Sequence, residues 1–359
     1  MPHPTDSTSA NDVAPLRLTS LSHGGGCGCK IAPGVLRDLL RDAATTAPFA
    51  QLLVGAETAD DAAVYRLNDE QAVIATTDFF MPIVDDPFDF GRIAAANALS
   101  DVYAMGGTPI LALAIVGMPI KVLPAATIRE ILRGGETICA QAGIPLAGGH
   151  SIDSVEPIYG LVALGIVHPH HVMRNAAARP GDVLVLGKPL GVGIYSAALK
   201  KDALDAAGYR AMIETTTRLN IAGPALAQLP GVHAMTDVTG FGLLGHLLEI
   251  CRGSGLHAHL HVLRLPFLAG VLALAEAGFV TGASARNWAS YGAEIKLAAG
   301  LDNARKALLC DPQTSGGLLV SCSADAVPGV LESFERHGFA QASVVGNLSD
   351  GIPGITVEH

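Results

Sequence analysis

Cysteine, lysine and glycine come together near the start of the chain in a combination that suits reactive chemistry. The segment reads Ser22-His-Gly-Gly-Gly-Cys-Gly-Cys-Lys30. Its glycines allow backbone conformations closed to other residues and a close approach to a ligand, and they leave the segment with little to pack. Lys30 and His23 would lower the pKa of Cys27 and leave a nucleophilic thiolate. The segment therefore predicts a mobile arm that carries out chemistry at Cys27.

Aspartates form a second group with chemical potential, because only 16% of the residues are charged. Four of them border expected strands, and a fifth lies inside an expected helix. Any one would by default be a capping or turn residue. Carboxylates at strand ends can converge on one crevice, and oxygen ligands without histidine suit Mg²⁺, which also binds water and substrate phosphates. We therefore expect a magnesium site among Asp60, Asp61, Asp78, Asp101 and Asp237.

Asp101 differs from the other four because it lies inside a strongly apolar helical pattern, one turn after Asn97. Residues four apart share one face of a helix. A buried aspartate requires a hydrogen-bond partner or a metal ion. The pattern predicts that Asn97 and Asp101 project into the same polar site.

Glycine-rich turns could offer backbone N–H groups to an anion. Segment 181–188 lacks the spacing and the Ser or Thr of a P-loop. Segment 240–245 fits the dinucleotide pattern but lacks the acidic residue expected about 20 positions later. Segments 148–151 and 314–317 are also candidates, although each alone is by default a plain turn. These turns by themselves therefore do not identify a phosphate-binding site.

Composition excludes several classes of protein. The 359 residues are 50% hydrophobic, which is enough for two domains with large cores. A net charge of −10 disfavours nucleic acid and anionic membranes as partners. No apolar run approaches the roughly 20 residues of a membrane span. The first fifteen residues lack a secretory pattern, so we expect a cytoplasmic protein. A mean hydropathy of +0.39 predicts apolar surface buried between subunits.

The six cysteines are too sparse for a disulfide framework and are expected to be reduced. Cys27 and Cys29 could form half of a zinc site, but no second cluster follows within reach. Cys139, Cys251 and Cys322 stand in apolar patterns and are expected to be small buried hydrophobic residues.

The elements that must position these residues alternate between strands and helices. An N-terminal domain is expected to follow the order β-β-α-β-α-β, which is ferredoxin-like α+β. The second helix begins after Pro124 and ends before Gly143. Hydrophobic runs place the strands at 62–67, 72–77, 110–117 and 158–167, and the helices at 88–105 and 125–142.

A second α/β section begins between about 168 and 180. It is expected to contain a strand at 183–186, a helix at 211–229, the strand that Asp237 ends and a last strand near 342–345. The predicted organisation is a disordered leader over 1–16, the arm with a short helix near 35–42 over 17–50, an N-terminal domain over 51–170 and a C-terminal domain over 171–359.

In chain order these segments resemble the selenophosphate synthetases, also called selenide, water dikinases, from about Leu18 to the last strand. Looser forms of the acidic and glycine motifs occur across the aminoimidazole-ribonucleotide synthetase (PurM-like) superfamily. The arm with Cys27 and Lys30 points to the selenium branch. Besides that arm, the resemblance rests on Asp60-Asp-Ala-Ala-Val-Tyr, Thr76-Thr-Asp-Phe-Phe-Met-Pro, Asn97-Ala-Leu-Ser-Asp, Ala147-Gly-Gly-His-Ser, Thr236-Asp-Val-Thr-Gly-Phe-Gly and Cys310-Asp-Pro-Gln-Thr-Ser-Gly-Gly.

The resemblance implies that ATP, hydrogen selenide and water give selenophosphate, AMP and orthophosphate, with Mg²⁺ and a monovalent cation such as K⁺. It implies a PurM-like homodimer in which the N-terminal sheets pair into a barrel, and a C-terminal α/β sandwich. ATP would lie between subunits and domains. A protein that delivers selenium is a further candidate partner.

By the same resemblance Cys27 and Lys30 are the catalytic pair, and Lys30 contacts phosphate. Cys27 stands where some members carry selenocysteine, so this chain is of the cysteine type. Whether Cys27 bonds to selenium and what Cys29 does stay open. The implied magnesium ligands are Asp61, Asp101 and Asp237. Besides Lys30, the implied ATP contacts are Thr58, Ala59, Asp60, Asp78, Asp101, Gly149, His150 and Ser151.

Two other functions remain. A small-molecule kinase of the same superfamily would release ADP rather than AMP, so product identity separates it from a dikinase. A non-enzymatic thiol carrier of selenium or zinc would ignore ATP, and the five aspartates argue against it.

Overall fold

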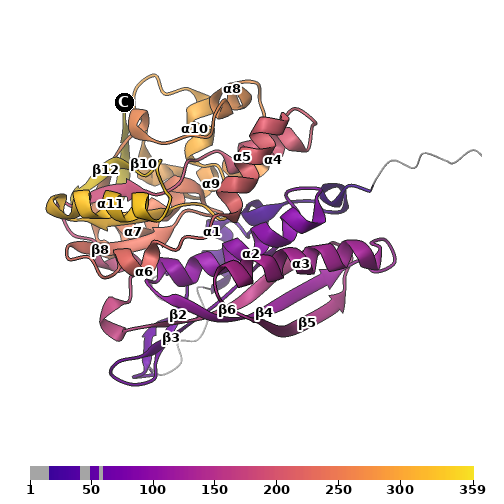
Figure 1. Ribbon diagram of the computed structural model, residues 1–359. Coiled ribbons are helices and arrows are strands. Elements are labelled where there is room, and N and C mark those ends of the chain that lie inside the picture. Colours follow the sequence, from indigo (N-terminus) through magenta and orange to yellow (C-terminus); the bar gives the residue numbers. More distant parts are fainter. Residues whose placement is uncertain (1–15, 41–48, 56–59) are drawn as a thin grey trace, which may run out of the picture.

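A computed structural model describes residues 16–40, 49–55 and 60–359, and two β-sheets organise this part of the chain (Figure 1). The N-terminal sheet has the order β1-β2-β3-β6-β4-β5, with helices α2 and α3 over one face. The strands are β1 (Leu52–Val54), β2 (Ala63–Arg66), β3 (Ala72–Phe80), β4 (Thr108–Met118), β5 (Leu146–Asp153) and β6 (Ile158–Val167), and the helices are α2 (Pro87–Ala104) and α3 (Ala125–Gln141).

Alternation of side chains gives the N-terminal sheet one covered face and one open face. Along β3, Ile74 and Phe80 are buried while Phe79 between them is 48% exposed. Ile110 of β4 and Ile152 of β5 are also exposed, at 45% and 57%. The open face and the β5 edge therefore display large apolar side chains, a feature typical of a surface that meets a partner.

Helix α2 brings polar residues into the middle of the molecule. Asp86 caps its start by accepting a hydrogen bond from the backbone N–H of Asp89 at 2.8 Å, and Pro87 occupies the first turn. Nearly every residue after that turn is buried, because α2 packs on β3, β6 and α3 and also on the C-terminal elements α5 and β8. Asn97 and Asp101 are consequently held between the two sheets.

The crossing of α2 over α3 depends on the absence of a side chain at Gly91. A Cβ there would overlap the carbonyl oxygen of Ile131. We expect Gly91→Ala to lower the free energy of unfolding by about 3 kcal/mol, because the two helices must separate to admit the methyl group. The midpoint of urea unfolding measures the change.

Gly329 provides the matched control, since it is also helical but a Cβ there has no neighbour within 4 Å. Gly329→Ala should raise stability by about 0.5–1 kcal/mol, because alanine loses less backbone entropy on folding. Equal effects of the two substitutions would contradict the tight crossing at Gly91.

The C-terminal sheet has the order β10-β13-β9-β12-β7-β11-β8 and is covered on both faces. Leu184 and Leu319 pack with α7 on one face, whereas Val185 and Val320 pack with α6 and α11 on the other. The strands are β7 (Val183–Leu186), β8 (Val232–Asp237), β9 (Leu256–His261), β10 (Ile295–Lys296), β11 (Leu318–Cys322), β12 (Ser343–Asp350) and β13 (Gly354–Glu358).

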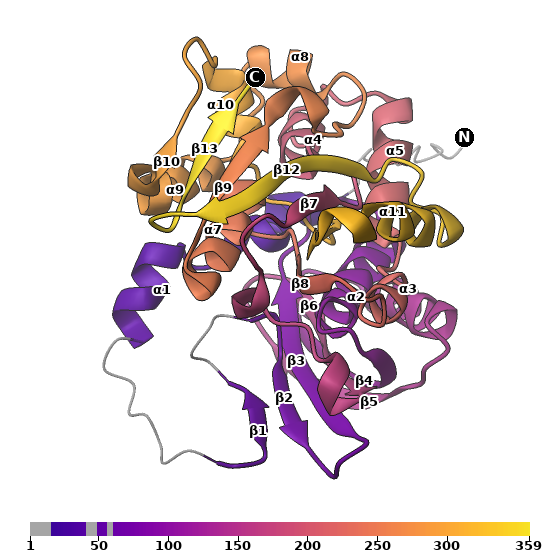
Figure 2. The same ribbon diagram turned by 90° about the vertical axis from the view of Figure 1, so that its left-hand side faces the viewer.

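Short helices complete this half of the molecule (Figure 2). They are α4 (Val192–Leu199), α5 (Ala206–Thr217), α6 (Gly223–Leu226), α7 (Gly242–Ser254), α8 (Val271–Glu276), α9 (Gly282–Tyr291), α10 (Asn303–Leu309) and α11 (Val327–Arg336). Among the described residues, no helix is long and apolar enough to cross a membrane.

The predicted α+β order is confirmed, with β1 and β5 as further strands. The expected end of a strand at Asp78 is wrong, because pairing with β6 continues β3 to Phe80. Segment 148–151 was expected to be a turn and is instead part of β5. The expected helix over 211–229 is also wrong, because α5 ends at Thr217 and a separate helix, α6, begins at Gly223 with Pro224 in its first turn. The short helix α1 covers Pro33–Leu40, and the leader up to residue 15 lies outside the described residues.

Candidate active site

The glycine-rich arm is packed into the molecule. Gly26 has a φ of +54°, and a Cβ there would overlap Ile83 and Thr314. Its N–H donates to the carbonyl oxygen of Met81 at 2.8 Å, and the Cys27 N–H donates to Thr314 Oγ1 at 3.1 Å. The expectation that this segment has little to pack is therefore wrong. Glycine is required here because the backbone fits closely between two neighbours.

Burial changes the expected chemistry of Cys27. The residue is only 1% exposed, and its Sγ donates to Asn97 Oδ1 at 3.1 Å. Burial, and then the charge of Asp78, raise the pKa of Cys27 well above its ordinary value, and Lys30 offsets only part of this rise. His23 pairs with Glu156 at 2.9 Å. The predicted thiolate is thus wrong, and the group is a protonated thiol.

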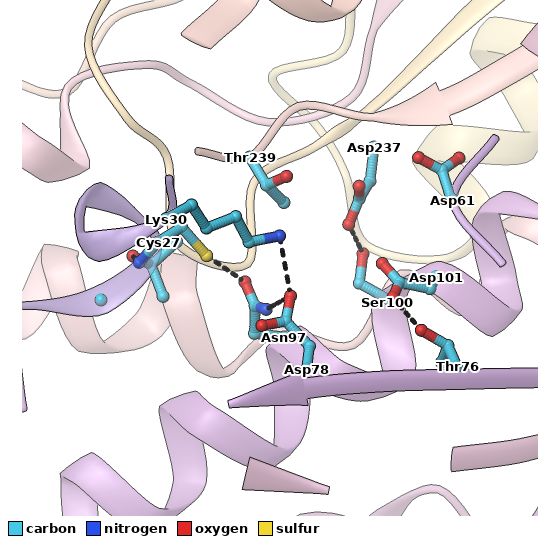
Figure 3. Close-up of polar contacts among 12 residues, drawn as sticks. Cys27, Lys30, Asp61, Thr76, Asp78, Asn97, Ser100, Asp101, Asp237 and Thr239 are labelled. Carbon is cyan, nitrogen blue, oxygen red and sulfur yellow. Dashed lines mark hydrogen bonds and ion pairs between the residues drawn. The ribbon is translucent and has the colours of Figure 1, made fainter. Parts of the chain in front are cut away.

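Asn97 connects the thiol to the charged residues (Figure 3). Its Oδ1 accepts from Cys27 Sγ and from the Ser315 N–H, the latter at 2.7 Å. Its Nδ2 donates to Asp78 Oδ2 at 2.8 Å, and Lys30 Nζ lies 3.0 Å from the same oxygen. A continuous polar chain therefore runs from thiol to amide to carboxylate to ammonium.

Replacing Asn97 by alanine should break this chain at its centre. We expect the variant to lose about 1–3 kcal/mol of stability, since buried donors are left unpaired. We also expect turnover to fall by roughly 100-fold, because the thiol loses the acceptor that orients it. Steady-state kinetics together with urea unfolding measure both effects. A folded variant with wild-type turnover would contradict the role of Asn97 as the residue that positions Cys27.

Lys30 is partly exposed at the edge of the site and stays protonated. Its side chain is 37% exposed, and its ammonium reaches inward to Asp78. Burial of the ammonium by itself would lower the pKa of Lys30, but Asp78, Cys27 and Asp101 together raise it well above its ordinary value. The group is therefore a permanent cation.

Three further aspartates lie together beside this chain, and they come from different elements (Figure 3). Asp61 precedes β2, Asp101 lies on α2 and Asp237 ends β8, so both halves of the molecule contribute. Each accepts a hydrogen bond from a hydroxyl group: Asp61 from Thr236 at 2.8 Å, Asp101 from Thr76 at 2.5 Å, and Asp237 from Ser100.

The three carboxylates repel one another. Burial and then the negative charge of Asp237 raise the pKa of Asp61 and of Asp101 well above their ordinary values, and burial also raises the pKa of Asp237. Asp61 Oδ2 is buried and has no hydrogen-bond partner among the residues that the structure describes. A set of buried, mutually repelling oxygen donors of this kind is what a divalent cation would stabilise.

The three carboxylates are thus of the kind that binds Mg²⁺, although in this structure they accept hydrogen bonds from hydroxyl groups. No group of three or more His, Cys, Asp or Glu side chains in the described ranges is placed so that it could hold a metal ion as it stands. The hydroxyls of Thr236, Thr76 and Ser100 orient the carboxylate oxygens instead.

The expected ATP contacts are only partly brought together. Thr58 and Ala59 lie outside the described residues. Asp60 accepts a hydrogen bond from the Asn175 N–H at 2.6 Å, and Asp78 and Asp101 lie within the site.

Gly149, His150 and Ser151 lie on the exposed edge strand β5. The sheet register runs from Asp78 through Leu161 and Ala114 to Gly149. Three strand spacings of about 4.8 Å therefore separate Asp78 from Gly149 by about 14 Å.

Several polar residues of the site were not predicted. Thr314 binds the arm, and Asn220 donates to Ser100 Oγ at 2.7 Å and to the Gly316 carbonyl at 2.9 Å. The break between α5 and α6 places Asn220 there. The glycine-rich turn 314–317 was a signal for Thr314, whereas the hydroxyls of Thr76, Ser100 and Thr236 carried no signal beyond their proximity to an aspartate in sequence.

The two arm cysteines have different surroundings. Cys29 Sγ donates to the Gly26 carbonyl at 2.8 Å, whereas Cys27 Sγ donates to Asn97. The thiols thus turn to different partners and do not form a chelating pair. The expected burial of Cys139, Cys251 and Cys322 is confirmed.

Comparison with known proteins gives two family matches and close relatives. The AIR synthase related protein N-terminal domain matches residues 59–167, and the corresponding C-terminal domain matches residues 179–357. Selenide, water dikinase of Burkholderia pseudomallei (strain K96243) is 69% identical over 98% of this chain and 99% of its own length. The enzyme of the same name from Rhizobium meliloti (strain 1021) is 59% identical over 97% of this chain and 99% of its own.

A solved structure shares the fold. The thiamine-monophosphate kinase from Stenotrophomonas maltophilia K279a superposes with a TM-score of 0.62 at 22% identity, covering 90% of this chain and 93% of that chain.

Proposed function

The chain belongs to the selenide, water dikinase family, and from this membership we propose how its own residues divide the synthesis of selenophosphate from ATP, selenide and water. The observation that carries the proposal is the polar chain from Cys27 through Asn97 and Asp78 to Lys30, beside Asp61, Asp101 and Asp237. It places a thiol, a fixed cation and a set of oxygen ligands in one site between the two halves of the molecule.

The central difficulty of the reaction is electrostatic, since an anionic selenium species must approach the polyphosphate of ATP. Lys30 supplies a permanent positive charge that would contact phosphate oxygens and stabilise the charge that spreads over them in the transition state. Asp78 and Asn97 hold that charge in position. The arm that carries Lys30 also covers the site and excludes bulk water while phosphate is transferred.

Asp61, Asp101 and Asp237 would hold Mg²⁺, which when bound supplies charge neutralisation for phosphate oxygens. A monovalent cation such as K⁺ is a further proposed requirement. Thr76, Ser100 and Thr236 orient the three carboxylates, and Asp61 Oδ2 provides an oxygen with no hydrogen-bond partner in the described part of the chain.

Cys27 would act on the selenium anion as a protonated thiol. Its single S–H donates to Asn97 Oδ1, so the polarisable sulfur itself would accept the Se–H of hydroselenide and hold it beside the phosphate to be transferred. Asn97 fixes the direction of the thiol. In this arrangement Cys27 orients the nucleophile and need not itself attack.

A homodimer would complete the ATP site. The N-terminal sheet exposes Phe79, Ile110 and Ile152, which favours pairing of this face and of the β5 edge with a second copy. Gly149, His150 and Ser151 would then contact ATP at the interface, as would Thr58, Ala59 and Asp60. The free cysteines fit a reducing compartment such as the cytoplasm, where a protein could deliver selenium.

Anaerobic phosphorus NMR tests the proposed reaction. The purified protein is incubated with ATP, Mg²⁺, K⁺ and sodium selenide, and parallel samples omit selenide or K⁺. A selenide-dependent signal with selenium satellites, accompanied by AMP and orthophosphate, is the expected result. ADP as the only nucleotide product would indicate a small-molecule kinase. Absence of turnover together with stoichiometric metal on the thiols would indicate a carrier.

A further inference from the structure

A cavity of about 310 Å³ lies against the arm on the side of α4 and α9. The backbone of Gly24, Gly25 and Gly28 forms one wall, and the ends of α4 and α9 form the others. None of the three aspartates proposed as magnesium ligands lines it. The cavity is therefore a space distinct from the acidic side of the site.

The charge of this cavity is opposite to that of the protein as a whole. Its basic lining residues are His23, Lys200, Lys201 and Arg286, and no aspartate or glutamate lines it. The chain has a net charge of −10. A concave surface lined by one sign of charge concentrates ions of the other sign. The cavity thus attracts anions on a protein that otherwise repels them.

Of the four basic lining residues, His23 pairs with Glu156 at 2.9 Å, whereas Lys200, Lys201 and Arg286 have no carboxylate partner among the described residues. Lys200 Nζ donates to the Gly24 carbonyl at 3.3 Å, and Arg286 Nη2 donates to the Gly28 carbonyl at 3.0 Å. An ammonium has three N–H donors and a guanidinium has five, so both keep donors for a ligand. The Lys201 ammonium lies 5.6 Å from the centre of the Phe279 ring. None of the three forms an ion pair with any residue that the structure describes.

One lining residue of the cavity, Thr314, also contacts the backbone of Cys27. Thr314 lines the cavity, and its Oγ1 accepts the backbone N–H of Cys27 at 3.1 Å. The cations at Gly24 and Gly28 hold the arm on either side of Cys27. An anion in the cavity would therefore lie directly behind the segment that carries the thiol.

We propose that this cavity binds hydroselenide before it reaches Cys27, so that the selenium anion enters on the side of the arm opposite the acidic cluster. The inference rests on the proposed function, because it names the entry site of that reaction's second substrate. An anion approaching from the carboxylate side would meet Asp61, Asp101 and Asp237 and the phosphates of ATP. The basic cavity offers a route without that repulsion.

Glutamine substitutions at the cations test the proposal. Lys200→Gln combined with Arg286→Gln removes both charges while each position keeps a side-chain N–H donor. We expect KM for selenide to rise at least about tenfold, with kcat and KM for ATP nearly unchanged, since local anion concentration falls. Lys296→Gln, an exposed cation on β10 outside the cavity, is the matched control and should leave both KM values unchanged.

Equilibrium dialysis of radiolabelled selenide, without ATP and without oxygen, measures binding apart from activity. The wild-type chain should retain selenide and the double variant should retain at least about tenfold less. Equal retention, or a parallel rise in KM for ATP, would overturn the proposal. Displacement of selenide by an equal concentration of orthophosphate would also overturn it, because the cavity would then serve the product.

Failure of the proposed function can be told apart from failure of this inference. If the wild-type chain makes no selenophosphate, the reaction is wrong, and dialysis still decides whether the cavity holds selenide. If the wild-type chain makes selenophosphate but the double variant has an unchanged KM for selenide, only the entry site is wrong.

Discussion

Replacing Lys30 by alanine is expected to reduce ATP consumption by roughly 10³-fold, the cost of removing a preorganised charge from a phosphoryl-transfer site. The ammonium is 3.0 Å from Asp78 Oδ2, and the surrounding negative charges raise the pKa of Lys30 well above its ordinary value. The fold should survive, because Asp78 keeps its hydrogen bond from Asn97 Nδ2 at 2.8 Å. Release of AMP and orthophosphate in a coupled assay measures the loss.

Lys296→Ala is the matched control for Lys30→Ala, since it removes an exposed cation from β10 without touching the site. Lys30→Arg keeps the charge but changes its shape, so partial recovery would show that charge is the main contribution. Wild-type turnover in Lys30→Ala would remove Lys30 from the catalytic residues and leave the arm without its assigned role.

The aspartates show how much of the site could be predicted from the sequence. Asp61, Asp78 and Asp237 were expected to converge because each borders a strand, and Asp101 was expected to face inward with Asn97. The structure places all of them between the two sheets (Figure 3). Local patterns thus predicted the convergence of these four residues but not its details, because Asp78 lies inside β3, which continues to Phe80, and Asp60 accepts a hydrogen bond from the Asn175 N–H.

The state of Cys27 could not be predicted in this way. The glycines and Lys30 around it indicated a thiolate, but burial in the folded chain, and then the charge of Asp78, raise its pKa, and both depend on residues distant in sequence. The same limit applies to β5, whose glycines suggested a turn. The hydrogen bonds of β4 to this segment make it a strand. Both errors come from contacts that only the tertiary fold creates.

Cys27→Ser is expected to abolish selenide-dependent turnover while ATP binding is retained. Serine preserves the donor toward Asn97 Oδ1 and is slightly smaller, so the packing of the arm against Thr314 should persist. The larger, polarisable sulfur that meets the selenium anion is lost, and the carboxylates that would hold ATP through Mg²⁺ lie elsewhere. Phosphorus NMR follows selenophosphate, and equilibrium dialysis with ATP follows binding.

Cys29→Ser is the matched control, because Cys29 lies on the same arm but its Sγ donates to the Gly26 carbonyl and not toward Asn97. If only Cys27 takes part in the chemistry, the Cys29 variant should keep turnover within about twofold, because Cys29 is only partly buried and such substitutions have small effects. Equal loss in both variants would indicate that the arm needs two thiols. The amount of metal bound per chain would then test the carrier alternative. Loss of ATP binding in Cys27→Ser alone would make Cys27 a structural residue, because its thiol would then hold the arm closed over the nucleotide and not meet selenium.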